Sequence, residues 1–226
     1  MGVFDRSDKP SQQLQPHEDD GQGVAGAATA FVERLLSVGI DGKGAFSSAE
    51  AVADEALRRR GTVPQAIDAV VWEHTRLAAA GGFVTGLGGF VTLPVALPAN
   101  VAGFYIVATR MAAAIAHLRG YDLQEGSVRS AVLLSLVGAD AQDVLAKVGY
   151  VGTSRLASLA TQQLPGPLMM AVNKAVGFRL LTQVGKKTFA RLGRGVPVMG
   201  GLLGAGMDGV LVRQIAAQVR TEFPQR

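Results

Sequence analysis

The uncharged stretch LAAAGGFVTGLGGFVTLPVALPANVAGFYIVAT (residues 77–109) decides the fold class of this chain. By length it can cross a bilayer, since about 20 apolar residues suffice. Its first half is rich in glycine, and Pro94 and Pro98 break or kink helical hydrogen bonding beyond it. We therefore expect two helices joined through residues 93–98. They either lie buried in a protein core or dip into one leaflet of a membrane as a re-entrant hairpin.

Helical patterns continue on both sides of this stretch, without a convincing series of strands and turns. Residues 1–23 are polar and lack periodicity, which is typical of a disordered tail. Residues 24–226 are long enough to bury a substantial core in one domain. The predicted fold class is therefore all-α, with a disordered N-terminal tail followed by a compact multi-helix bundle of glycine-rich, tightly packed apolar helices.

The overall composition leans toward membranes. Hydrophobic residues make up 48% of the chain and charged residues 18%, against about 25% in ordinary soluble domains. The chain has no cysteine, which excludes disulfides, thiolate metal sites and cysteine nucleophiles. Its N-terminus lacks the apolar stretch of a secretory signal, so we expect a cytoplasmic protein of bacterial type.

Small residues recur at four-residue spacing in the last predicted helix, residues 197–222. The pairs are Gly200 with Gly204 and Ala205 with Gly209. Such spacing lets helix backbones approach closely, in membranes and in tight soluble bundles alike. It predicts a glycine zipper, within the bundle or between copies of the chain in an oligomer.

Positive charge is concentrated toward the C-terminus. Residues 144–226 carry 11 basic and 2 acidic side chains, whereas residues 1–143 carry 11 basic and 16 acidic ones. Residues 178–192 form an amphipathic helix of the kind that lies on anionic membranes, and the alternative is an ordinary surface helix of a basic protein. No nucleic-acid motif accompanies this charge, so lipid is the expected partner. The predicted contacts with anionic lipid are Lys186, Lys187, Arg191 and Arg194.

Four polar residues fall on otherwise apolar helix faces: His74, Arg110, His117 and Asp208. A lone buried carboxylate is costly, so we expect Asp208 to pair with Arg110 or His74 inside the bundle. The pair either fixes the register of packed helices or forms a polar floor for a lipid headgroup. A third interpretation is a metal site built from the two histidines and the carboxylate. Their spacing matches no ligand signature, and we predict no catalytic residue, metal or cofactor.

Two blocks of sequence, GLGGFVTLPVALPANVAGFYIVATRMAAAIAHLRGYDL (residues 86–123) and NKAVGFRLLTQVGKKTFARLGRGVPVMGGLLGAGMDG (residues 173–209), resemble the EcsC family of bacterial proteins. The likeness covers roughly residues 60–222 and leaves out the polar tail. The resemblance implies a helical protein of poorly defined activity without established catalytic residues. The family is named after a gene that lies beside those of an ATP-driven exporter, which implies a role at the cell envelope.

These observations favour a non-enzymatic, membrane-associated helical protein that serves as a partner or regulator of cell-envelope or export machinery. It would lie peripherally, or partly inserted, at the inner face of the cytoplasmic membrane, where a transporter complex is a candidate partner. One alternative is a soluble carrier with an apolar ligand between helices 101–118 and 198–219. The other is an uncharacterised enzyme with a buried His/Asp site.

Overall fold

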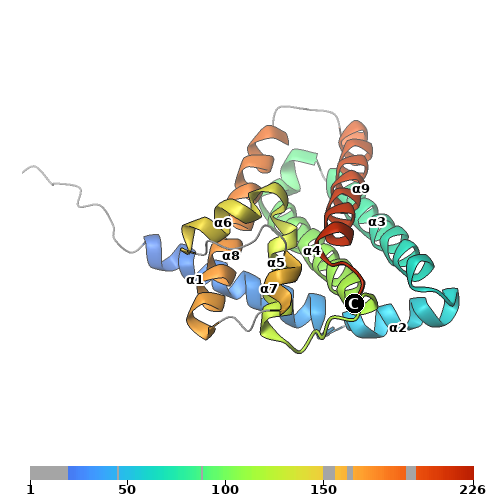
Figure 1. The fold of residues 1–226 in the computed structure, drawn as a ribbon. Coiled ribbons are helices and arrows are strands. Elements are labelled where there is room, and N and C mark those ends of the chain that lie inside the picture. Colours follow the sequence, from blue (N-terminus) through green and yellow to red (C-terminus); the bar gives the residue numbers. More distant parts are fainter. Residues whose placement is uncertain (1–19, 45, 88, 150–155, 162–164, 192–196) are drawn as a thin grey trace, which may run out of the picture.

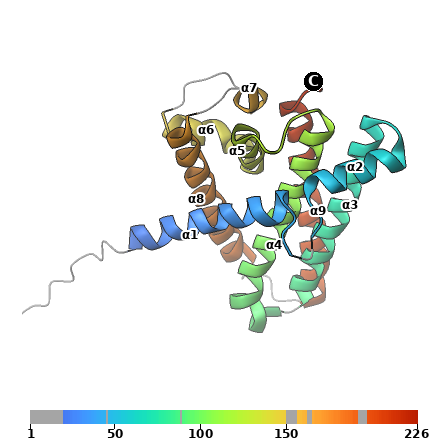
Figure 2. The same ribbon diagram turned by 90° about the horizontal axis from the view of Figure 1, so that it is seen from below.

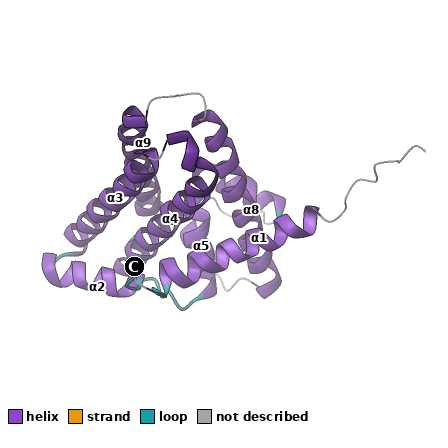
Figure 3. Ribbon diagram, turned by 180° about the vertical axis from the view of Figure 1, so that it is seen from behind, coloured by secondary structure: helices purple, strands orange, loops and turns teal. Residues whose placement is uncertain are grey.

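The computed structural model describes residues 20–226 except 45, 88, 150–155, 162–164 and 192–196, and within 85–100 and 183–203 it describes the path of the helices without their side chains. All secondary structure in these described residues is helical, which confirms the all-α prediction (Figure 3). The helices are α1 (Asp20–Arg34), the π-helix η1 (Leu35–Ile40), α2 (Ala49–Arg60), α3 (Val63–Leu87), α4 (Gly89–Leu118), α5 (Gly126–Leu136), the 3-10 turn η2 (Gly138–Asp140), α6 (Ala141–Lys147), α7 (Leu156–Thr161), α8 (Gly166–Arg191) and α9 (Pro197–Glu222).

The helix α4 forms the centre of the molecule. It packs against α2, α3, α5, α9 and the π-helix η1 (Figure 1). The segment Val101–Leu118 is long and apolar enough to cross a membrane, and it is the one such helix in the described part of the chain. Because 67% of that segment is buried inside the protein, other helices already cover most of its apolar surface.

The first helix of the uncharged stretch ends at Leu87 and the second begins at Gly89, so the two helices are not joined through residues 93–98. The helix α4 runs without interruption through Pro94 and Pro98, so the predicted position of the turn was wrong. Each proline removes one hydrogen bond from a helix that neighbouring helices hold in place. The glycines at residues 86–89 are weaker helix formers and common helix ends, so the chain turns there.

The N-terminal boundary of the helical part also differs from the prediction. The helix α1 begins at Asp20, so residues 20–23 belong to it and not to a tail. Residues 1–19, for which the sequence predicts disorder, lie outside the described residues. At the other end of the chain, α9 has the bounds expected from the sequence, residues 197–222.

The helices α3 and α9 pack against each other as an antiparallel pair and make the most extensive helix contact among the described residues (Figure 1). Their backbones touch where Gly82 faces Gly204. A Cβ atom at Gly82 would lie 2.6 Å from the Gly204 carbonyl oxygen, and one at Gly204 would lie 2.5 Å from the Gly82 carbonyl oxygen. At the other end of the pair, the Arg220 guanidinium binds the Asp68 carboxylate at 2.7 Å.

Four helix ends lie together at one end of the molecule, which we call the tip. They are the C-terminal turns of α3 and α8 and the N-terminal turns of α4 and α9 (Figures 1 and 2). The helix α1 crosses α4 and α8 farther from the tip (Figure 2). The tip therefore brings the glycine-rich end of α3 and start of α4 close to the glycine-rich start of α9.

Alanine substitutions two residues apart on α9 test the backbone contact. We expect Gly204→Ala to lower the free energy of unfolding by roughly 1–3 kcal/mol, because the new methyl group has no room beside the Gly82 carbonyl. The matched control is Gly206→Ala, where nothing lies within 4 Å of the added atom. It should raise stability by up to about 1 kcal/mol through helix propensity. Urea denaturation measures both, and equal effects would contradict the contact.

Candidate functional site

The buried residues His74 on α3 and Arg110 on α4 meet in the core. The Arg110 Nε–H donates to His74 Nε2 at 3.3 Å, and His74 Nδ1 lies 2.8 Å from the Val70 carbonyl oxygen. Because a carbonyl oxygen can only accept, Nδ1 carries the ring proton and Nε2 is the acceptor. His74 is therefore neutral and held as one tautomer by its two partners.

Burial explains this protonation state. His74 is 1% exposed, and removal from water lowers its pKa to about 4, more than the hydrogen bond to Val70 raises it. The Arg110 cation lowers the His74 pKa further. Burial also lowers the pKa of Arg110, which is 5% exposed, while the Glu73 carboxylate opposes that shift. An arginine nevertheless stays charged at neutral pH, so the core holds one cation beside a neutral ring.

An aromatic ring covers the other side of Arg110. The Arg110 Cζ atom lies 4.7 Å from the centre of the Phe46 ring, in cation–π contact. Phe46 is itself 42% exposed and belongs to the segment between η1 and α2. Gly42 and Gly44 take positive φ angles in this segment, at +73° and +85°, which residues with side chains rarely adopt. Phe46 is not among the residues predicted from the sequence, although an aromatic residue within the glycine-rich run DGKGAFSS could have indicated it.

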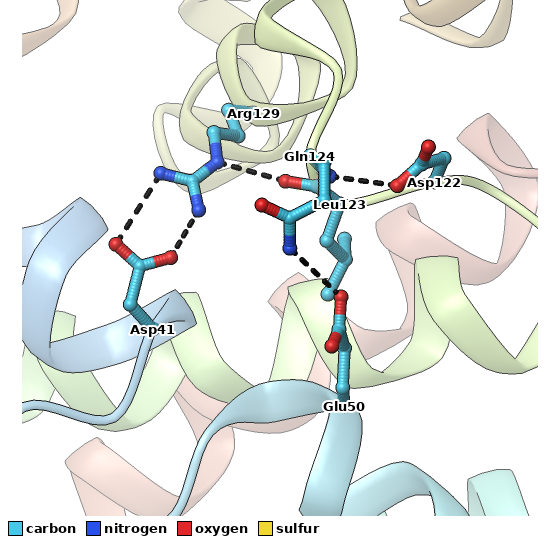
Figure 4. A network of polar contacts seen from close by, with 6 residues as sticks. All are labelled: Asp41, Glu50, Asp122, Leu123, Gln124 and Arg129. Atoms are coloured by element: carbon cyan, nitrogen blue, oxygen red, sulfur yellow. Dashed lines mark hydrogen bonds and ion pairs between the residues drawn. The ribbon is translucent and has the colours of Figure 1, made fainter.

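A polar network fixes both ends of the segment that carries Phe46 (Figure 4). On one side, the Arg129 guanidinium of α5 forms an ion pair with Asp41, and its Nε donates to the Leu123 carbonyl at 2.8 Å. On the other side, the Gln124 amide donates to the Glu50 carboxylate at 3.2 Å. The segment therefore holds Phe46 over Arg110 through contacts with α5 and with the connection that precedes it.

His117 does not belong to the buried cluster. It lies one heptad after Arg110 on α4, as the sequence indicates, but its side chain is 32% exposed and its Nε2 lies 3.3 Å from the Asp54 carboxylate of α2. The prediction of a buried His117 was wrong because this side chain lies beside Asp54 of α2 at the edge of the core, while Ala116 and Leu118 next to it are buried.

Asp208 is buried on α9, as predicted, and is 5% exposed. Its carboxylate lies against α3 at Gly82, where an added Cβ atom would be 2.5 Å from Oδ2. Arg110 donates its Nε hydrogen bond to His74. The expected pairing of Asp208 with Arg110 or His74 stays a prediction. Within the described residues, no three His, Cys, Asp or Glu side chains lie close enough to hold a metal ion.

The four basic residues predicted to contact anionic lipid lie outside the described side chains. The helix α8 carries the first three of them toward the tip, and the last one lies between α8 and α9. These residues are Lys186, Lys187, Arg191 and Arg194.

Large apolar side chains are exposed on α3 and α9, in the halves of these helices nearer the tip. On α3, Leu77, Phe83 and Val84 are 44%, 38% and 68% exposed, and on α9, Met207 and Val210 are 43% and 54% exposed. Exposed apolar side chains that gather on one surface usually mark an interaction site. The sequence indicated uncharged helices here, but it could not show which of their faces remains open.

A groove of about 740 Å³ lies between α1, η1, α4 and α8. Its walls are mainly apolar and include Phe31, Val38 and Val101, while Arg34 and Lys43 add positive charge and Glu33 adds negative charge. This groove does not lie between residues 101–118 and 198–219, where the carrier alternative predicts an apolar ligand.

The neutral state of His74 predicts a specific loss of stability in acid. Between pH 6.5 and about 4 the unfolded chain binds a proton at this residue and the folded chain does not, so stability falls as the pH falls. Through His74 alone we expect a loss of roughly 3 kcal/mol from pH 7 to below pH 4. Urea unfolding at a series of pH values measures it. His74→Gln should flatten this part of the profile, whereas the control His117→Gln should keep it; a profile unchanged by His74→Gln would refute the assignment.

Comparison with known proteins adds no family and no relative. No family model matches this chain, and neither a curated protein nor a solved structure matches it.

Proposed function

We propose that this protein is a non-enzymatic, membrane-associated helical protein that inserts its tip partly into a bilayer. The observation that carries the proposal is the distribution of charge along the outer face of α3 and α9. On α3, the described side chains beyond Arg76 are uncharged. On α9, from residue 204 to the one before Arg213, the single charged side chain is Asp208, which is buried. The exposed side chains described on these two helices toward the tip are therefore apolar, and charge begins at these two arginines.

The side chains at this boundary suit a membrane interface. Trp72 is the one tryptophan of the chain and lies one turn before Arg76, with 57% of its surface exposed. Tryptophan is enriched where a protein passes from lipid to water, and arginine can extend its charged group toward the headgroups. The antiparallel arrangement brings Arg213 of α9 to a similar level. These residues support a partly inserted tip.

Charge supplies the second part of the attraction. Lys186, Lys187, Arg191 and Arg194 lie in the last turns of α8 and the connection to α9, next to the tip in sequence and topology. Each basic residue near an anionic leaflet contributes about 1 kcal/mol to binding. The chain would thus combine an apolar end with a basic rim, as interfacial proteins do.

The resemblance to the EcsC family suggests the setting. It supports a place at the inner face of the cytoplasmic membrane, as a partner or regulator of a transporter. The proposal includes oligomers that form through the small residues of α9, although Gly204 already packs against Gly82 of the same chain.

The groove beside α1 favours a second candidate function, a carrier for an amphiphile with one acyl chain. Its apolar walls can cover a chain, and Arg34 and Lys43 can bind an anionic head. Native mass spectrometry of protein purified without detergent distinguishes a carrier, which retains one bound lipid, from a membrane-binding protein, which does not.

Co-sedimentation with vesicles tests membrane insertion. We expect the full chain to bind phosphatidylcholine vesicles that contain phosphatidylglycerol, more strongly at low salt. Val84→Glu and Val210→Glu should each weaken binding roughly 10- to 100-fold, because each removes about 1.5–3 kcal/mol of apolar burial. Both positions are exposed, so the fold should persist.

Two controls accompany this experiment. Met170→Glu changes a side chain that is 70% exposed near the other end of α8 and should leave binding unchanged. The fluorescence of Trp72 should shift to the blue when vesicles are added, since the residue would move from water to the interface. Equal binding by Val84→Glu and the unsubstituted protein, or an unchanged Trp72 spectrum, would rule out the proposed tip.

A further inference from the structure

We propose that Arg110 anchors a binding site for a small oxyanion, a phosphate or carboxylate group, that enters beside Phe46. This inference does not rest on membrane insertion, because it concerns the buried pair between α3 and α4.

Arg110 is a buried cation without an ion-pair partner among the described residues. This side chain is 5% exposed, yet none of the ion pairs between described residues includes it. Its hydrogen bond goes to the neutral His74, and Glu73 influences it only through space. Buried cations in proteins are usually paired, because a charge removed from water without a partner is costly. An anion at Arg110 would supply the missing charge.

The two Nη atoms of Arg110 remain available to donate hydrogen bonds. His74 takes the Nε–H of Arg110, which leaves the two Nη atoms with their N–H groups. These atoms are not among the fully buried nitrogens of the described side chains that lack a hydrogen-bond partner, so they keep some contact with water. Two parallel N–H groups of a guanidinium match two oxygens of a phosphate or carboxylate, which makes this edge a suitable anion anchor.

The Arg110 guanidinium is held in one orientation. His74 binds its Nε, and the Phe46 ring covers its face at 4.7 Å. The ion pair of Arg129 with Asp41 ties down the segment that carries Phe46 (Figure 4). A guanidinium fixed on one side and on one face loses little freedom when an anion binds its remaining edge, so the site is preorganised.

The anion that binds beside Arg110 and His74 can come from two sources. His74 lies on α3 between Trp72 and Arg76, at the level where the outer surface changes from charged to apolar. A free phosphate can reach this level from water, and the phosphate of a lipid headgroup can reach it from a membrane. Both have the same chemistry at Arg110.

Thermal unfolding of the full chain tests the site with inorganic phosphate as the probe, titrated against chloride at constant ionic strength. We expect a saturable rise in the melting temperature for the unsubstituted protein and for the control Arg60→Gln, which removes an exposed arginine at the end of α2. Arg110→Met should abolish the rise. Arg110→Lys keeps the positive charge but loses the two parallel N–H groups of the guanidinium. It should bind phosphate at least about tenfold more weakly. Because Arg110→Lys preserves a buried cation, it remains informative if Arg110→Met fails to fold.

A site-specific readout and a lipid arm complete the test. In nitrogen-15 spectra, phosphate should shift the Nε–H signal of Arg110. Flotation with vesicles that contain phosphatidic acid tests the lipid source: binding that depends on Arg110, without a response to free phosphate, assigns the site to a headgroup. Equal responses of the Arg110→Lys and unsubstituted proteins to both probes, or no response to either, would overturn the proposal. The phosphate arm contains no lipid, so its outcome is independent of the Val84→Glu experiment.

Discussion

The structure depends on the contact between the backbones of α3 and α9 at Gly82 and Gly204. An added methyl group on either side would come within 2.6 Å of the opposite carbonyl oxygen, so the two helices can approach this closely only with glycine at both places. The approach buries the inner face of α9, with Asp208 on it. Other apolar side chains of the two helices divide between the core, as for Val70 and Val212, and the surface, as for Val84 and Val210.

The same helix α3 serves both proposed sites. One of its faces carries His74 into the core against Arg110, and the opposite face carries the exposed Trp72 and, toward the tip, Phe83. A cation in the centre of a helical core is expensive, and this core keeps it with a neutral imidazole and an aromatic ring. Neither partner cancels the charge. The favourable interactions that remain available to Arg110 are therefore with an anion.

The proposed membrane association rests on one asymmetry of the molecule. Apolar side chains gather toward the tip, and basic residues of α8 and the following connection lie next to it in the chain. Acidic side chains lie mostly in the N-terminal part of the sequence, on elements farther from the tip, such as α2. A surface that is apolar at one end and basic around it has a natural counterpart in an anionic lipid layer.

The sequence by itself determined the helical class, the bounds of α9 and the burial of His74, Arg110 and Asp208, because periodicity and the cost of isolated charges are local properties. Only the tertiary structure decided where the uncharged stretch turns. The prolines are tolerated inside α4 because neighbouring helices support it, whereas the glycines at 86–89 lack intrinsic helix preference. It also decided that His117 lies at the surface and that Arg110 meets His74 and Phe46. These pairings join residues far apart in the chain, and the spacing of one helix carries no information about which neighbour covers it.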